Sequence, residues 1–137
     1  MMTEGNAAIV LRYFLETHNA PRNMAVIDEL CGPEYGARMK AHIAAELRAF
    51  PDMHFTVEEV IASDERVVLR WSARGTHRGE LPSRLGPLAP TGKAATATCI
   101  TIYHVVEGKI VGEMGIMDTI GLYLQLGILA PSEHVPC

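Results

Sequence analysis

Asp118 is the residue of this sequence best placed to carry out acid–base chemistry. It ends an almost wholly apolar stretch that begins at Lys109, and helix-forming residues follow it at once. A carboxylate in apolar surroundings is costly unless it is paired or protonated, and desolvation raises its pKa toward the range that suits proton transfer. The same position also suits a helix N-cap, which stabilises by about 1 kcal/mol. The residues alone leave both roles open.

His77 is the second candidate for chemistry. It shares a face of a predicted strand with Trp71. It either donates a hydrogen bond to a substrate carbonyl, orients Asp118, or is a structural histidine at a strand end. Trp71 is expected to pack in the core with its indole N–H on a partner. Tyr13 either packs in the core or points its hydroxyl into a pocket.

Metal and disulfide chemistry are not expected. The histidines are scattered without ligand spacing, and the three cysteines include no Cys-x-x-Cys pair. Reduced thiols in a cytoplasm are the simplest interpretation of these cysteines: Cys31, Cys99 and Cys137.

Length and charge exclude several classes of function. The 137 residues are expected to form one domain over 1–137, with a hydrophobic core large enough to fold without disulfides or a structural metal. The net charge of −4 provides no basic surface for nucleic acid or an anionic membrane. No signal peptide is visible, and no apolar run reaches the roughly 18 residues that a membrane span needs. A cytoplasmic protein is therefore expected.

The N-terminal part of the chain has helical periodicity. Apolar residues predict a helix over 4–18 and a third helix over 33–50, which Pro51 stops. Between them, Pro21 suits the first turn of a short helix that ends near Cys31. A last helix is predicted over 119–126, with Gly127 ending it.

From His54 onward the period changes to two, which is typical of strands. The alternation predicts strands over 54–61, 66–77, 94–106 and 109–118, with a loop over 79–92 that is rich in proline and glycine. Helices followed by an antiparallel meander indicate an α+β fold with a curved sheet and helices over one face.

The Glu107-Gly108 turn predicts the register of the last hairpin. A two-residue turn there pairs Val106 with Lys109. It also predicts the pairs Tyr103–Gly112, Thr101–Met114 and Cys99–Ile116. One face would then carry these side chains: Cys99, Thr101, Tyr103, Met114, Ile116 and Asp118. A slip of one residue would exchange the two faces.

Six short motifs occur in a collinear order over roughly residues 45–129. They are Ala49-Phe50-Pro51-Asp52, Arg66-Val67-x-x-Arg70-Trp71, Gly75-Thr76-His77-x-Gly79-Glu80, Pro90-Thr91-Gly92, Gly108-Lys109-Ile110 and Asp118-x-x-Gly121-Leu122-x-x-Gln125-Leu126-Gly127. In this combination the chain resembles the SnoaL-like polyketide cyclases of the nuclear transport factor two-like superfamily. The resemblance implies a cone-shaped α+β barrel, a pocket between sheet and helices, and a homodimer formed through the outer face of the sheet.

The resemblance also implies a function. The characterised cyclases close the last ring of an aromatic polyketide by intramolecular aldol condensation without metal or cofactor. Their general acid/base is an aspartate at the position of Asp118. A hydrophobic small molecule is the expected substrate, with His77 as a second catalytic residue. The expected lining of the pocket is Tyr13, Trp71, Thr101, Tyr103, Met114 and Ile116.

Two alternatives to ring closure stay open. In the first, the pocket is kept but Asp118 opens an epoxide or assists a dehydration or hydroxylation. In the second, the chain is a non-catalytic small-molecule-binding dimer module and Asp118 is only a helix cap.

Overall fold

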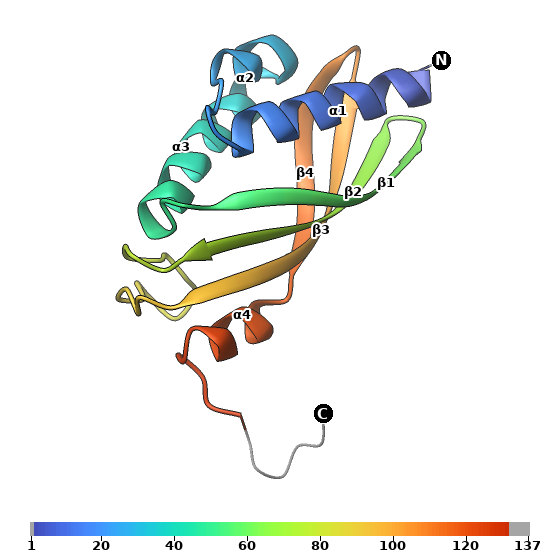
Figure 1. Ribbon diagram of the computed structural model, residues 1–137. Helices are drawn as coiled ribbons and strands as arrows, with labels where there is room; N and C mark the ends of the chain where they lie inside the picture. The colour runs from blue at the N-terminus through green and yellow to red at the C-terminus, as the bar shows by residue number, and fades with distance from the viewer. Residues whose placement is uncertain (1, 132–137) are drawn as a thin grey trace.

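The computed structural model describes residues 2–131. This part of the chain contains four helices and one four-stranded sheet, joined by loops (Figure 1). The helices are α1 (Met2–His18), α2 (Ala25–Leu30), α3 (Pro33–Ala49) and α4 (Thr119–Gln125). The helices predicted over 4–18, 33–50 and 119–126 are confirmed to within two residues. The second begins later than predicted, because residues 19–24 form a turn in which Arg22 N donates to Asn19 O.

The sheet is antiparallel and follows the order of the sequence, β1-β2-β3-β4. Its strands are β1 (His54–Ser63), β2 (Arg66–Thr76), β3 (Ala94–Val106) and β4 (Lys109–Met117). The sheet is strongly curved, α1 and α3 cover one of its faces, and α4 lies beside one end of β3 (Figure 1). The predicted α+β class with a curved sheet is confirmed.

The predicted register of the last hairpin holds for its first two pairs, the second being Val105–Ile110, and is wrong beyond them. Val106 pairs with Lys109 as expected, but a β-bulge leaves Val111 without a partner and shifts β4 by one residue. Because side chains alternate with period two, this shift exchanges the two faces of β4. The observed pairs are His104–Gly112, Tyr103–Glu113, Ile102–Met114, Thr101–Gly115, Ile100–Ile116 and Cys99–Met117.

The shift moves Met114 and Ile116 to the outer face of the sheet. Their side chains are 71% and 77% exposed, and Glu113 and Met117 take the inward positions instead. The expectation that Met114 and Ile116 share a face with Thr101 is therefore wrong, and neither residue lies against the cavity described below.

The core lies between the sheet and the helices on its covered face. α1 contributes Tyr13 and Phe14 to the same core cluster as Leu69 of β2. A second, smaller cluster joins α4 to the end of α3 through Phe50 and Leu122. Two cysteines, Cys31 and Cys99, are buried free thiols, and Cys137 lies outside the described residues. Within residues 2–131, none of the helices is long and apolar enough to cross a membrane.

His18, the last residue of α1, is buried among aromatic rings. It stacks on Phe14 with ring centroids 4.4 Å apart, meets Phe55 edge-on, and has the Thr17 hydroxyl 2.9 Å from its Nδ1. This burial lowers the pKa of His18 to about 3, because the imidazolium would lose its hydration.

Acidification from pH 7 to pH 5 is expected to lower the free energy of unfolding by roughly 2 kcal/mol through His18 alone. In the unfolded chain His18 takes up a proton near pH 6.5, whereas in the folded chain His18 stays neutral down to about pH 3. Stability is therefore lost as the pH falls below 6.5. Urea denaturation at several pH values measures the slope. The His18→Gln variant should show a shallower one, and an equal slope would contradict the assignment.

Candidate active site

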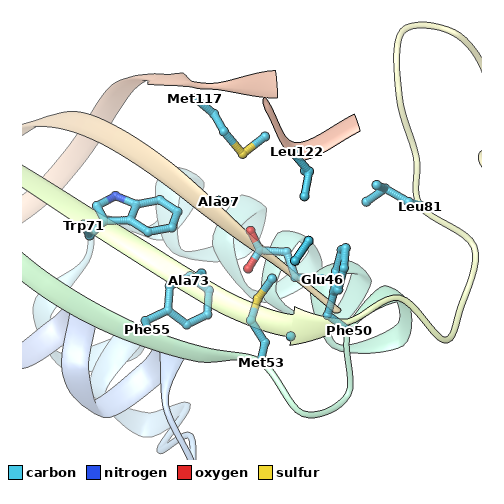
Figure 2. Close-up of a pocket in the computed structure, with 12 residues that line it drawn as sticks. Glu46, Phe50, Met53, Phe55, Trp71, Ala73, Leu81, Ala97, Met117 and Leu122 are labelled. Carbon is cyan, nitrogen blue, oxygen red and sulfur yellow. The ribbon is translucent and has the colours of Figure 1, made fainter. Parts of the chain in front are cut away.

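An apolar cavity of about 90 Å³ lies between the C-terminal half of α3, the sheet and α4 (Figure 2). The aromatic rings of Phe50, Phe55 and Trp71 form one part of its wall. Flexible aliphatic side chains form another: Met53, Leu81, Met117 and Leu122. An apolar wall of this kind suits a hydrophobic small molecule.

Small residues on two neighbouring strands create the space. Ala73 and Gly75 of β2 pair with Ala97 and Ala95 of β3, and all four line the cavity. Alternation places them on the same inward face as Leu69, whose larger side chain fills the core further along β2. The run of alanines and glycine at one end of the sheet therefore opens a cavity where the other end is packed.

Glu46 is the one ionisable side chain among the described residues that line the cavity. It belongs to the last turns of α3, its side chain is 23% exposed, and its carboxylate lies among the apolar side chains of the wall (Figure 2). Sequence reasoning missed this residue. The available signal was its position three residues after Ile43, which continues the buried stripe formed by Tyr35 and Met39.

His42 holds the Glu46 carboxylate. Its Nε2 lies 2.6 Å from Glu46 Oε1, one turn earlier on the same helix. The hydrogen bond to Glu46 raises the pKa of His42, with a further contribution from the charge of Glu113. The imidazole is largely exposed, and it borders a surface groove with Arg38 and Glu113. The pair therefore reaches from the cavity to solvent.

The structure places Trp71 on the cavity wall and gives its indole N–H the expected partner. Trp71 Nε1 donates to Thr101 Oγ1 at 3.0 Å, which fixes the plane of the ring. Thr101 is buried behind it on β3. Cys99 lies 4.0 Å from the same hydroxyl, and burial raises the pKa of its thiol. A thiolate nucleophile is therefore disfavoured at this site.

Tyr13 and Tyr103 lie in the core rather than on the cavity wall. The Tyr13 hydroxyl is 3.4 Å from that of Tyr35, which donates to Glu113 Oε1 at 2.6 Å. Burial raises the pKa of all three tyrosines, so each remains a neutral donor. This buried cluster ties α1 and α3 to β4.

Asp118 caps α4. Its Oδ1 accepts from the backbone N–H of Gly121 at 2.9 Å, and the carboxylate is exposed rather than turned into the cavity. A Cβ at residue 121 would lie only 2.1 Å from Asp118 Oδ2, so the cap needs glycine there. Of the two roles open from the sequence, the N-cap is the one seen in the structure. Met117, the preceding residue, does line the cavity.

His77 is buried beneath the cavity rather than in it. Its ring stacks on Phe50 with centroids 5.3 Å apart, and Phe50 lines the cavity. Thr91 N donates to His77 Nδ1 at 3.2 Å, so the ring proton belongs on Nε2, which has no partner among the described residues. His77 therefore supports the wall and links it to the loop after β2.

The described residues do not bring together a set of side chains that could bind a metal ion. In residues 2–131, no group of three or more His, Cys, Asp or Glu side chains is arranged to hold a metal ion. The cavity thus offers one carboxylate, an imidazole behind it and an apolar wall, a set suited to proton transfer on a hydrophobic molecule.

Comparison with known proteins gives a family match over most of the chain. The model of the SnoaL-like polyketide cyclase family matches residues 12–126. No curated protein matches the sequence significantly.

Solved structures of similar fold come from several bacteria. AclR, a proposed hydroxylase from Streptomyces galilaeus, is 24% identical with a TM-score of 0.78, covering 98% of this chain and 87% of its own. TsrD from Streptomyces laurentii is 21% identical with a TM-score of 0.80, covering 94% and 100%. A proposed SnoaL-like polyketide cyclase from Jannaschia sp. CCS1 is 19% identical with a TM-score of 0.79, covering 96% of each chain. At these identities the likeness establishes the fold alone.

Proposed function

We propose, from the premise that this chain belongs to the SnoaL-like polyketide cyclase family, that it catalyses cofactor-independent ring closure or isomerisation of a polyketide-like small molecule. The observation that carries this proposal is an apolar cavity whose described lining contains a single ionisable side chain, Glu46. A substrate carbon between two carbonyls needs little more than a base, because its own carbonyls delocalise the resulting charge. An enclosing wall then holds the reacting atoms together.

The size of the cavity defines what binding requires. About 90 Å³ is room for roughly three water molecules, whereas pockets for drug-sized ligands start near 300 Å³. A polycyclic substrate therefore needs wall side chains to move. Met53 and Met117 suit this, because unbranched thioether side chains change rotamer readily, and Met117 is already partly exposed.

The acid/base role that the resemblance implies for Asp118 stays a prediction, and one substitution separates it from capping. Asparagine caps helices about as well as aspartate, so Asp118→Asn removes the charge while keeping α4. Because Oδ1 is engaged by Gly121 N and the carboxylate is exposed, we expect ring closure of anthraquinone-type β-keto esters to stay within about threefold of wild type. Chromatography of the products measures it.

A fall of about 100-fold or more in Asp118→Asn would instead support acid/base catalysis by Asp118. Asp118→Ala serves as the control for the cap and should lower the free energy of unfolding by about 1 kcal/mol. If wild type closes no β-keto ester of the panel but still accelerates exchange of their acidic hydrogens, the protein is an enzyme of another reaction. Hydroxylation or epoxide opening on the same fold would then be the next chemistry to assay.

A non-catalytic binding module is the second candidate function. The capping geometry of Asp118 and the scarcity of polar groups on the cavity wall favour it. The two functions differ in one readout, since a binding module would bind β-keto esters without accelerating the exchange of their acidic hydrogens above its rate in buffer. In both functions we propose that Trp71, His77 and Thr101 shape the cavity wall and take no part in the chemistry.

We also propose that the protein forms a homodimer through the outer face of the sheet. Four large apolar side chains lie there on adjacent strands and are exposed by 40% or more. This outer-face patch consists of Ile100, Ile102, Met114 and Ile116. A continuous apolar patch of this kind on a sheet is typical of a protein–protein interface.

A further inference from the structure

We infer that Glu46 is the carboxylate that exchanges protons with the substrate, and that His42 is a positioning residue that links it to solvent. The inference rests on the proposed function, because it assigns the proton transfer of that reaction to one named group. Both residues lie on α3, outside the part of the chain from which the sequence suggested a base.

The position of Glu46 satisfies the first demand on a base, which is access to the reacting carbon. Its carboxylate is the one ionisable group on the described cavity wall, and Met53, Phe50 and Ala97 line the cavity with it (Figure 2). Asp118 does not meet this demand, since its carboxylate is exposed and bound to the backbone of α4. A substrate that fills the cavity therefore contacts Glu46.

The position of His42 satisfies the second demand, which is a way to return protons to water. Its Nε2 is 2.6 Å from Glu46 Oε1, and 56% of the imidazole side chain is exposed. Glu113 of β4 and Arg38 of α3 border the same groove as His42. One carboxylate and one guanidinium cation therefore lie near the His42–Glu46 pair. The groove contains solvent space of about 330 Å³. Protons can thus pass between cavity and solvent without opening the cavity wall.

The proposed reaction balances within the substrate and Glu46. The ionised carboxylate takes a proton from a carbon that lies between two carbonyls, leaving an enolate. The enolate carbon forms a bond to a ketone carbon of the same molecule, and that ketone oxygen receives the electron pair. The oxygen then takes the proton from the Glu46 carboxylic acid, which restores the carboxylate. No electrons or heavy atoms are exchanged with any other reactant, and a proton that passes through His42 to water is replaced by one from water.

Deuterium exchange tests the base directly. A panel of β-keto esters from one ring to three fused rings is incubated with and without enzyme in deuterated buffer, and exchange is measured by NMR as the loss of the acidic C–H signal above the rate without enzyme. Ring closure is followed in parallel by chromatography. Trp71 is the only tryptophan and lies on the cavity wall, so its fluorescence reports binding independently of chemistry.

We expect Glu46→Gln to lose exchange and closure by roughly 10²- to 10⁴-fold while it still binds the esters. Glu34→Gln, an exposed glutamate at the start of the same helix, is the matched control and should keep both activities. If Glu46→Gln exchanges and closes as fast as wild type, the inference about Glu46 is overturned and the proposed function stands.

The remaining outcomes separate the two proposals. If wild type exchanges deuterium without closing rings and Glu46→Gln does not exchange, the base assignment stands and ring closure is overturned. If wild type binds the esters but neither exchanges nor closes, both are overturned, and the binding module is the correct function.

The pH dependence tests His42. Above its raised pKa the imidazolium loses the charge that faces Glu46 and Glu113, so wild-type exchange should decline on a basic limb above pH 6.5. His42→Gln should lack this limb and be slower at neutral pH. A basic limb that persists unchanged in His42→Gln would show that His42 does not position the carboxylate.

Discussion

Gly79→Ala is expected to lower the free energy of unfolding by about 3 kcal/mol, as severe overpacking does. A Cβ on residue 79 would lie 1.9 Å from the backbone oxygen of Arg48 at the end of α3. Backbone at that point cannot rotate away as a side chain can. Arg78 N and Gly79 N also both donate to Ala49 O, at 2.9 and 3.2 Å, so the clash breaks the contact that holds the loop to the helix.

This loop contact matters for the cavity as well as for stability. Leu81 follows two residues later and forms part of the cavity wall, and His77 precedes it beneath Phe50. Detaching the loop would open one side of the cavity, so Gly79→Ala should also weaken binding of β-keto esters measured by Trp71 fluorescence.

Urea denaturation measures the effect of Gly79→Ala, and Gly112→Ala is the matched control. A Cβ on Gly112 meets nothing within 4 Å, so that variant should stay within about 0.5 kcal/mol of wild type. Equal stability of the two variants would mean that the loop after β2 does not pack on the end of α3.

The second large effect is expected on assembly, where Ile116→Asp should raise the dissociation constant of the dimer by at least roughly 100-fold. A carboxylate buried at an apolar interface without a partner loses its hydration and gains nothing in return. Ile116 is 77% exposed in the single chain and neighbours Ile100 through their strand pairing. Folding should be unaffected, because the substituted side chain lies outside the core.

Sedimentation over a range of concentrations measures this dissociation. Leu85→Asp is the control, since Leu85 is an exposed apolar residue, at 69%, in the loop after β2 and not on the outer face of the sheet. A wild-type protein that stays monomeric at high concentration, or an Ile116→Asp variant that dimerises as wild type does, would rule out this interface.

The bulge in β4 shows where sequence reasoning reached its limit. The predicted two-residue turn at Glu107-Gly108 is confirmed, since both residues have the positive φ values that such a hairpin turn requires. The extra residue at Val111 leaves no comparable mark in the sequence. It reverses which side chains of β4 face inward, so a correct turn led to a wrong face for Met114 and Ile116.

Asp118 and Glu46 show the same limit for the site. An aspartate before a helix that carries glycine three residues later is a local capping pattern, and the structure contains that cap. Glu46 has no such local pattern. It becomes notable only because small residues on β2 and β3 leave a space opposite its place on α3.

By itself, the sequence determined the element order, the strand and helix boundaries to within a few residues, the α+β class and the resemblance to the family. These follow from periodicity, turn residues and caps, which act between near neighbours in the chain. Only the tertiary structure decided which carboxylate lines the cavity and which face of β4 points inward. The physical reason is that both depend on contacts between distant segments. One inserted residue at Val111 exchanges the faces of β4, and small side chains on β2 and β3 leave the space that Glu46 borders.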